Sequence, residues 1–199
     1  MVIPQQDFTL QSDDALIVVD VQNDFLPAGK LAVAQGDEVV PVLNEYIRRF
    51  AAKALPIFAT RDWHPADHCS FRERGGPWPP HCIAGTPGAE FGPGLALTPK
   101  VEVISKATQR DRDAYSGFEG TDLARRLQQS AVRRVFVGGL ATDYCVFNTV
   151  KDALKEHFVT VLLLDAVRAV DVQRGDGEVA ITEMLKVGAQ PGRLEWIHS

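Results

Sequence analysis

The sequence predicts an α/β fold in which a mostly parallel sheet is covered by helices on both faces. Short apolar runs rich in β-branched residues recur along the 199 residues, and they do not alternate strictly with polar residues. This pattern is typical of strands that are buried on both faces. Helical patterns lie between the runs, and such alternation implies right-handed crossovers within one sheet. The length favours a single domain over residues 1–199.

The apolar runs place the expected strands. Five of them are clear, and the one nearest the end of the chain is weaker. The predicted strands cover residues 15–19, 56–60, 101–104, 135–138 and 159–164, with the weaker candidate at 194–197.

Four helices are predicted from apolar stripes at helical spacing, together with polar or glycine residues at their ends. They run from a cap at Asp37 to about Lys53, from a cap at Thr121 to about Gln129, from near Cys145 onward, and over about 177–187 with Gly188 at the end.

Composition narrows the class of protein. Lys and Arg number 21 against 26 Asp and Glu, which gives a net charge of −5 and argues against nucleic acid or an anionic membrane as partner. No stretch is apolar for long enough to span a bilayer. Three cysteines form no dense disulfide framework, which suggests a reducing compartment, and the first residues lack the pattern of a signal peptide. We therefore expect a cytoplasmic protein.

A long stretch at about 61–99 lacks periodicity and is rich in Pro, Gly and His. Three of the five histidines, His64, His68 and His81, fall within it. A compact domain rarely keeps so long an irregular segment unless the segment has a function. We interpret it as a loop that contributes to a metal or substrate site.

Three residues with chemical potential follow separate predicted strands, namely Asp20, Lys106 and Cys145. Taken singly, Asp20 could serve as a turn residue, Lys106 as a solvated surface lysine and Cys145 as a small buried side chain. A parallel sheet, however, brings the carboxyl ends of its strands to one edge. There Asp20 could act as acid or base, Lys106 could stabilise negative charge, and the start of a helix could activate the thiol.

Asp62 and His64 suggest a metal site at the same edge. In an extended chain they point to the same side, and the loop can return His81 to them. A carboxylate with neutral imidazoles suits Zn²⁺, Fe²⁺ or Mn²⁺ and leaves positions open for water or substrate. The alternative is that these are solvated loop histidines, because a single D-x-H pattern is common by chance.

Together these segments resemble the nicotinamidase branch of the isochorismatase-like cysteine hydrolases. The resemblance covers nearly the whole chain, and its segments are specific as an ordered set. They are VDVQNDF at 19–25, DWHP at 62–65, WPPHC at 78–82, Lys106, YSGF at 115–118 and GLATDYC at 139–145. The resemblance implies a three-layer α/β/α sandwich.

The resemblance also assigns roles to the matching residues. It implies a catalytic triad of Asp20, Lys106 and Cys145. It implies one divalent metal ion, held by Asp62, His64 and His81, with His68 at a position that is a ligand in only some members. The other implied positions are an aromatic wall of Phe25, Trp78 and Tyr115 and an oxyanion hole from the amides of Ala141 and Cys145, with a cis peptide bond before Ala141.

The implied activity is the hydrolysis of nicotinamide to nicotinic acid and ammonia through a cysteine thioester, a reaction of NAD salvage, with pyrazinamide as a further substrate. The resemblance also suggests a homo-oligomer. Two alternatives stay open. One is a sister hydrolase that acts on an isochorismate-like ether or a carbamoyl compound, although such an enzyme of the isochorismatase type would not need the metal residues. The other is a non-catalytic metal-binding protein that uses His64, His68, His81 and Cys82, which leaves the triad residues unexplained.

Overall fold

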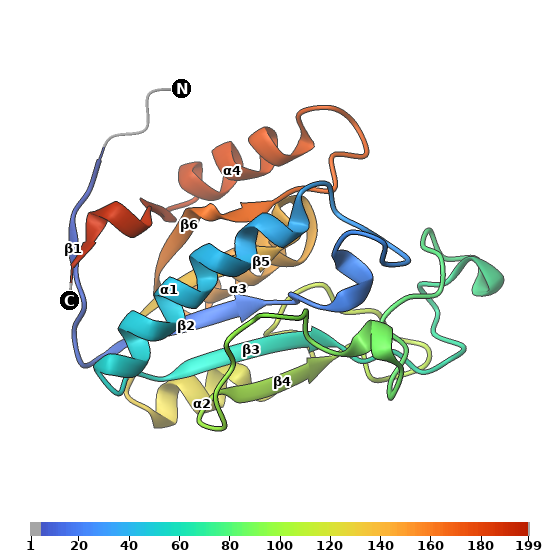
Figure 1. Cartoon of the computed structure of the whole chain (residues 1–199), viewed down its shortest axis with the longest axis horizontal. Helices are drawn as coiled ribbons and strands as arrows, with labels where there is room; N and C mark the ends of the chain where they lie inside the picture. The colour runs from blue at the N-terminus through green and yellow to red at the C-terminus, as the bar shows by residue number, and fades with distance from the viewer. Residues whose placement is uncertain (1–4, 199) are drawn as a thin grey trace.

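A six-stranded parallel sheet forms the middle layer of the computed structural model, which describes residues 5–198 (Figure 1). The strand order is β4-β3-β2-β5-β6-β7, so the first long strand of the chain lies near the centre. The five clear strand predictions are confirmed, and each observed strand is one to four residues longer than predicted. The strands are β2 (Asp14–Val19), β3 (Ile57–Asp62), β4 (Glu102–Lys106), β5 (Arg134–Leu140), β6 (Val159–Arg168) and β7 (Gln190–Gly192).

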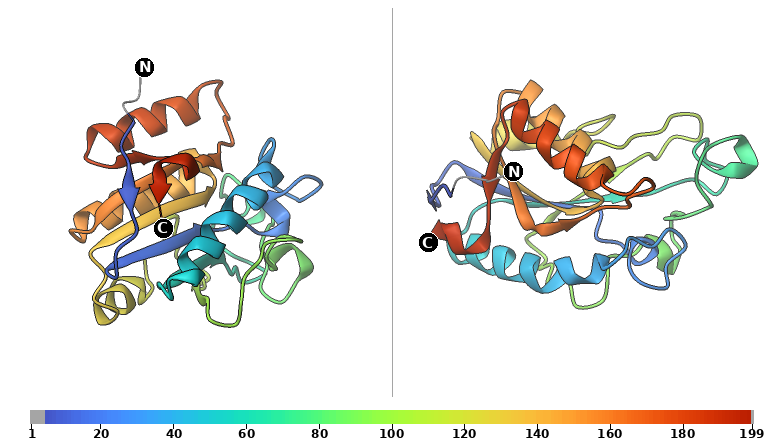
Figure 2. Two further views of the ribbon diagram at one scale, coloured as in Figure 1. Left: turned by 60° about the vertical axis from the view of Figure 1, so that its left-hand side comes forward. Right: turned by 90° about the horizontal axis from the view of Figure 1, so that it is seen from above.

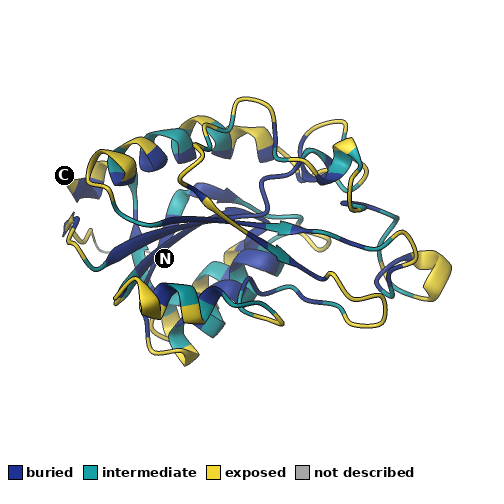
Figure 3. Ribbon diagram, turned by 90° about the horizontal axis from the view of Figure 1, so that it is seen from below, coloured by how far each residue is buried: buried dark blue, intermediate teal, exposed yellow. Residues whose placement is uncertain are grey.

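Helices cover both faces of the sheet, which confirms the three-layer sandwich (Figure 2). On β2 alternate side chains point to opposite faces, because Leu16 and Val18 join one apolar cluster while Ala15 and Ile17 join the other. The sheet is buried between the two helical layers, whose exposed residues face outward (Figure 3). One face carries α1 (Val39–Ala52), and the other carries α2 (Leu123–Gln129), α3 (Phe147–Lys155) and α4 (Asp176–Lys186).

Three of the helix predictions are confirmed to within about two residues at each end. The α1 helix begins at Val39 because a short 3-10 turn at 36–38 takes up the predicted cap Asp37. The predicted cap Thr121 lies one residue before the N-cap of α2, and its hydroxyl accepts a bond from the Leu123 amide at 3.3 Å. Beyond α4, Gly188 has a φ of +117°, as expected for a glycine that follows a helix.

The end of the chain differs from the prediction. The run at 194–197 is not one strand, because residues 194–196 form a 3-10 turn and only Ile197 begins β8 (Ile197–His198). This strand pairs with β1 (Phe8–Thr9) in a small separate sheet. The last strand of the main sheet is instead β7, which contains Pro191 and lies at the sheet edge, where a residue without an amide hydrogen is tolerated.

The predicted loop runs from the end of β3 to the start of β4, and only short 3-10 turns interrupt it. Residues 61 and 62 belong to β3, so the irregular segment begins at Trp63. None of the helices within residues 5–198 is long and apolar enough to cross a membrane. Residues 1–4 and 199 of the expected single domain, and with them part of the segment used for the signal-peptide prediction, lie outside the described residues.

Candidate active site

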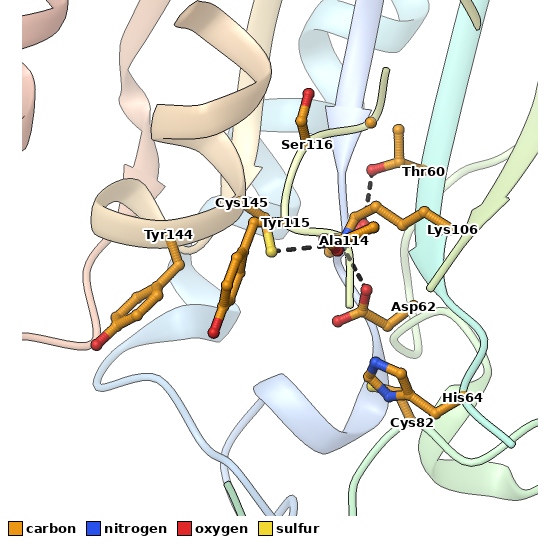
Figure 4. A network of polar contacts seen from close by, with 12 residues as sticks. Thr60, Asp62, His64, Cys82, Lys106, Ala114, Tyr115, Ser116, Tyr144 and Cys145 are labelled. Carbon is orange, nitrogen blue, oxygen red and sulfur yellow. Dashed lines mark hydrogen bonds and ion pairs between the residues drawn. The ribbon is translucent and has the colours of Figure 1, made fainter. Parts of the chain in front are cut away.

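The carboxyl ends of three strands bring Asp20, Lys106 and Cys145 together, as the strand pattern predicts. Asp20 directly follows β2, Lys106 is the last residue of β4, and Cys145 lies in a turn directly after β5. The Lys106 Nζ is 2.9 Å from the Asp20 Oδ2. The same nitrogen is 3.4 Å from the Cys145 Sγ (Figure 4). All three residues are buried. An acid, an amine and a thiol therefore share one site that excludes bulk water.

Lys106 is the centre of the polar network. Its ammonium group donates to the Asp62 carboxylate, to the Ala114 carbonyl at 3.1 Å and to the Cys145 sulfur. An ammonium has three hydrogens, so these three acceptors use all of them. Burial alone would lower the pKa of Lys106, but the carboxylates of Asp20 and Asp62 hold that pKa well above its ordinary value. Lys106 is therefore a fixed cation.

The acid and the thiol both give up their protons less readily than they would in water. Burial raises the pKa of Asp20, and the nearby Lys106 opposes this effect only in part. Burial also raises the pKa of Cys145 well above 9.0, again against the attraction of Lys106. The free site therefore holds a thiol rather than a preformed thiolate, and it needs a nearby acceptor for the thiol proton. The Cys145 sulfur and a carboxylate oxygen of Asp20 lie within 4.8 Å of each other.

A tight turn after β5 presents the thiol. The prediction that a helix begins near Cys145 is confirmed to within two residues, since residues 142–146 form one turn of π-helix and α3 begins at Phe147. The turn depends on Gly139, whose φ is +130° and whose Cα faces the Val19 backbone so closely that a Cβ would lie 2.1 Å from the Val19 carbonyl oxygen. A side chain at this position is therefore excluded.

The Leu140–Ala141 peptide bond is cis, as the resemblance implies. Ala141 and Cys145 line the same cavity, so the two residues of the predicted oxyanion hole lie at its wall. The Ala141 carbonyl accepts bonds from the amides of Tyr144 at 3.1 Å and Val146 at 3.0 Å, which fixes the backbone between the two residues.

Asp62, His64 and His81 form a buried set of possible metal ligands, as predicted, with ligand atoms within 4.8 Å of one another. The His64 Nδ1 is 3.0 Å from the His81 carbonyl oxygen, and the His81 Nδ1 is 2.8 Å from the Pro79 carbonyl oxygen. A carbonyl can only accept, so each Nδ1 carries the hydrogen and each Nε2 keeps a free lone pair. Burial lowers the pKa of His64 to about 4 and also lowers that of His81, which keeps both rings neutral. These residues fit a divalent metal ion.

Asp62 is the charged member of this set. Burial opposes its ionisation, but the Lys106 ammonium holds the pKa of Asp62 below its ordinary value. The carboxylate therefore stays negative beside the two neutral rings. Its backbone is fixed by Gln22, whose side chain accepts from the Asp62 amide at 2.8 Å and donates to the Asp62 carbonyl at 2.8 Å.

His68 lies beside His64, with ring centroids 4.4 Å apart, but its nitrogens are already bonded within the protein. Its Nε2 is 3.1 Å from the Arg112 carbonyl, and its Nδ1 lies 2.8 Å from the hydroxyl of Ser70. With Asp113 and His64 it forms a second group of possible ligands, which shares His64 with the Asp62 set. The structure thus gives His68 a bonded position beside the metal residues, and its role as a ligand stays a prediction.

The predicted aromatic residues line one cavity with Asp62, His81 and Cys145 at its wall. The Trp78 indole donates to the Tyr115 hydroxyl at 2.9 Å, and the Phe25 ring lies 5.6 Å from the His81 ring between centroids. Three further lining residues, Leu31, Tyr144 and Val170, are not among the predicted wall residues. Tyr144 packs its ring against Trp78 and Tyr115, with centroid distances of 5.1 and 5.8 Å. The sequence feature that could have identified Tyr144 as a cavity residue is its position next to Cys145.

Comparison with known proteins places this site in a family. A model of the isochorismatase domain matches residues 14–195. The chain belongs to the isochorismatase family. A nicotinamidase/pyrazinamidase of Mycobacterium tuberculosis is 39% identical over 183 residues, covering 88% of this chain and 95% of that protein.

Solved structures in the family have the same fold. A pyrazinamidase of Pyrococcus horikoshii in complex with zinc superposes with a TM-score of 0.88 at 52% identity, covering 92% of this chain and 99% of the other. A PnC1 protein of L. infantum in complex with nicotinate gives a TM-score of 0.87 at 37% identity, covering 96% and 98%. The likeness therefore extends over nearly the whole described chain.

Proposed function

We propose that this chain is an amidohydrolase that converts nicotinamide to nicotinic acid and ammonia. The name of its relative, a nicotinamidase/pyrazinamidase, supports a reaction of this type. The observation that carries the proposal is the contact of Lys106 with both Asp20 and Cys145 at a cavity walled by aromatic side chains. A flat heteroaromatic amide fits such a wall, with its carboxamide directed at the sulfur. Pyrazinamide presents the same two groups and is a further proposed substrate.

In the proposed reaction Asp20 accepts the Cys145 proton, and the sulfur attacks the carboxamide carbon. The amides of Ala141 and Cys145 stabilise the tetrahedral oxyanion, while protonated Asp20 gives its proton to the departing ammonia. Asp20 then activates a water molecule, which hydrolyses the thioester and releases nicotinic acid. Lys106 keeps its charge throughout and balances the carboxylates around it.

Asp62, His64 and His81 are the proposed ligands of one divalent ion, with Zn²⁺, Fe²⁺ and Mn²⁺ as candidates for this donor set. When bound, such an ion supplies a Lewis acid that orients the ring nitrogen of the substrate. Neutral histidines with both Nδ1 atoms bonded to carbonyls support this assignment. We place His68 as an optional further ligand, because its ring already has partners in the protein.

The decisive test is ammonia release from nicotinamide by the purified protein, before and after treatment with a chelator. We expect turnover that falls on chelation and returns when the metal is restored. A purified protein without stoichiometric metal, which releases no ammonia from nicotinamide but turns over an isochorismate-like ether or a carbamoyl compound, would favour a sister hydrolase. A fold that melts on chelation, with a Cys145 inert to alkylation, would favour a non-catalytic metal-binding protein.

Assembly and location are predictions that rest on the family resemblance and on composition. We propose a homo-oligomer, which light scattering on the purified protein tests directly. A cytoplasmic location is the expectation from an acidic chain with three unpaired cysteines, and fractionation of the host cell tests it.

A further inference from the structure

Thr60 holds Asp20 by two hydrogen bonds from the neighbouring strand. Thr60 lies on β3 and is fully buried, and its carbonyl accepts the Asp20 amide at 3.1 Å. Its hydroxyl donates to the Asp20 Oδ1 at 2.7 Å. Asp20 itself has a φ of +49° at the end of β2, so its backbone leaves the strand sharply at this point. The two bonds from Thr60 fix both the backbone and the carboxylate of that residue.

The two carboxylate oxygens of Asp20 are consequently unlike. Oδ1 accepts the Thr60 hydroxyl, whereas Oδ2 is a buried oxygen with no hydrogen-bond partner among the described residues. Oδ2 lies 2.9 Å from the Lys106 Nζ, but the hydrogens of that ammonium bond to Asp62, Ala114 and Cys145. Oδ2 is thus held at ion-pair distance from the cation, whereas Oδ1 is bonded to Thr60.

The methyl group of Thr60 has a separate contact. It faces Gly117 so closely that a Cβ on this glycine would lie 2.8 Å from the Thr60 Cγ2. Gly117 belongs to the segment that follows the cavity residue Tyr115, and its amide donates to the Thr149 hydroxyl at 2.9 Å. Thr60 therefore contacts both the acid and the loop that lines the cavity. Its hydroxyl bonds to Asp20, and its methyl group packs against Gly117.

We propose that Thr60 is a positioning residue that makes Asp20 Oδ2 the acceptor of the Cys145 proton. By occupying Oδ1, the Thr60 hydroxyl fixes the carboxylate with Oδ2 toward the thiol. In the step concerned the S–H bond breaks and an O–H bond forms at Oδ2. The electron pair left on sulfur forms the C–S bond, and the carbonyl π electrons move to oxygen. The inference rests on the proposed hydrolase function of this site.

Three substitutions of Thr60, compared with the wild type, separate the effect of the hydroxyl from the effect of the methyl group. Thr60→Val keeps the shape and removes the hydroxyl, Thr60→Ser keeps the hydroxyl and removes the methyl, and Thr60→Ala removes both. A hydrogen bond to a charged acceptor contributes about 1.5–3 kcal/mol, here to holding the Asp20 carboxylate in place. Thr60→Val should therefore lower kcat about tenfold or more, with little change in KM. Thr60→Ser should turn over faster than Thr60→Ala by a similar factor.

A second readout does not depend on turnover. The rate at which iodoacetamide alkylates Cys145 in the absence of substrate should fall in the Val and Ala variants and recover in the Ser variant. Peptide mass spectrometry separates Cys145 from the half-exposed Cys69. A purely structural role of Thr60 would change stability and KM but would not follow the hydroxyl in both assays.

The outcomes separate this inference from the proposed function. The role of Thr60 would be overturned if Thr60→Val kept the wild-type kcat and alkylation rate. It would also be overturned if the Ser variant were as slow as the Ala variant in both assays. If Thr60→Val does not fold, the Ser and Ala pair decides in the same way. If the wild-type protein releases no ammonia from nicotinamide, the proposed function fails, whereas the alkylation rates still test the positioning of Asp20.

Discussion

Replacement of Lys106 by Met would remove the cation that holds the site together. The methionine side chain has similar length and no charge, so it leaves Asp20 and Asp62 as buried carboxylates without their shared partner. Removing one member of a buried ion pair costs about 3–5 kcal/mol, because an uncompensated charge stays in the interior. For a chain of this size that corresponds to a fall in melting temperature of roughly 6–20 °C.

The assay is urea unfolding of the metal-free protein at neutral pH, followed by circular dichroism. Lys106→Met should lower the free energy of unfolding by about 3–5 kcal/mol. The exposed Lys100 offers a matched control, because Lys100→Met removes the same charge at the surface and should change that free energy by less than about 0.5 kcal/mol. Equal effects of the two substitutions would refute the buried cation as the source of stability.

The difference in the free energy of unfolding between the wild type and Lys106→Met should also depend on pH. The pKa of Asp62 is lowered in the folded protein, so its stabilising contribution is complete above its ordinary value of 3.8 and is lost as pH falls through the folded value. The raised pKa of Lys106 gives a contribution that is complete below 10.5 and is lost only as pH rises through its folded value. The gap should therefore be widest between these limits and shrink toward pH 4, where the carboxylates of the variant take up protons. A gap that widens on acidification would contradict this reasoning.

Four further outcomes follow from the same geometry. Cys145→Ala should abolish ammonia release with metal content unchanged, which an ammonia assay and metal analysis check together. His81→Ala should weaken zinc binding about tenfold or more in competition with a chelator, whereas His68→Ala should weaken it less, because the His68 ring is already bonded elsewhere. Gly139→Ala should destabilise the fold by more than about 1 kcal/mol in urea, since the new Cβ would clash with the Val19 carbonyl. Alkylation of Cys145 in the free protein should accelerate through pH 9, because burial raises the thiol pKa; a plateau near pH 6 would contradict that assignment.

The sequence contains enough information to place the strands and most of the helices. The β2 strand is buried along its whole length, so its residues are apolar nearly throughout and stand out as a run. The α1 helix buries only one side, and its apolar residues recur at helical spacing. The edge strand β7 carries neither signal, because it has three residues and one of them is proline. A parallel edge pairing of that kind is determined by the neighbouring strand rather than by its own sequence.

The chemistry of the site was predictable where a residue type is itself informative. Asp20 and Cys145 each follow a strand, and that position together with their chemistry indicates a role. Thr60 carries no comparable signal, because a threonine within a strand is common for structural reasons, and Tyr144 carries only the signal of its place next to Cys145. Their contacts depend on the register of β2 against β3, which pairs Val19 with Thr60, and on the π-helical turn, which no local pattern announces.

The predicted triad and the predicted metal site form one charge cluster, because Asp62 of the metal set contacts Lys106 of the triad. Its carboxylate accepts from Lys106 on one side and lies among the ligand atoms of the metal set on the other. With Asp20 and Asp62 ionised and Lys106 protonated, the cluster carries one net negative charge in a site without bulk water, which favours a cation at the remaining position. A substitution at Asp62 should therefore affect metal binding and the reactivity of Cys145 together, while Cys145→Ala affects only the reaction. Zinc affinity and alkylation rate measured on Asp62→Asn would test this coupling, and a loss of one without the other would separate the two sites.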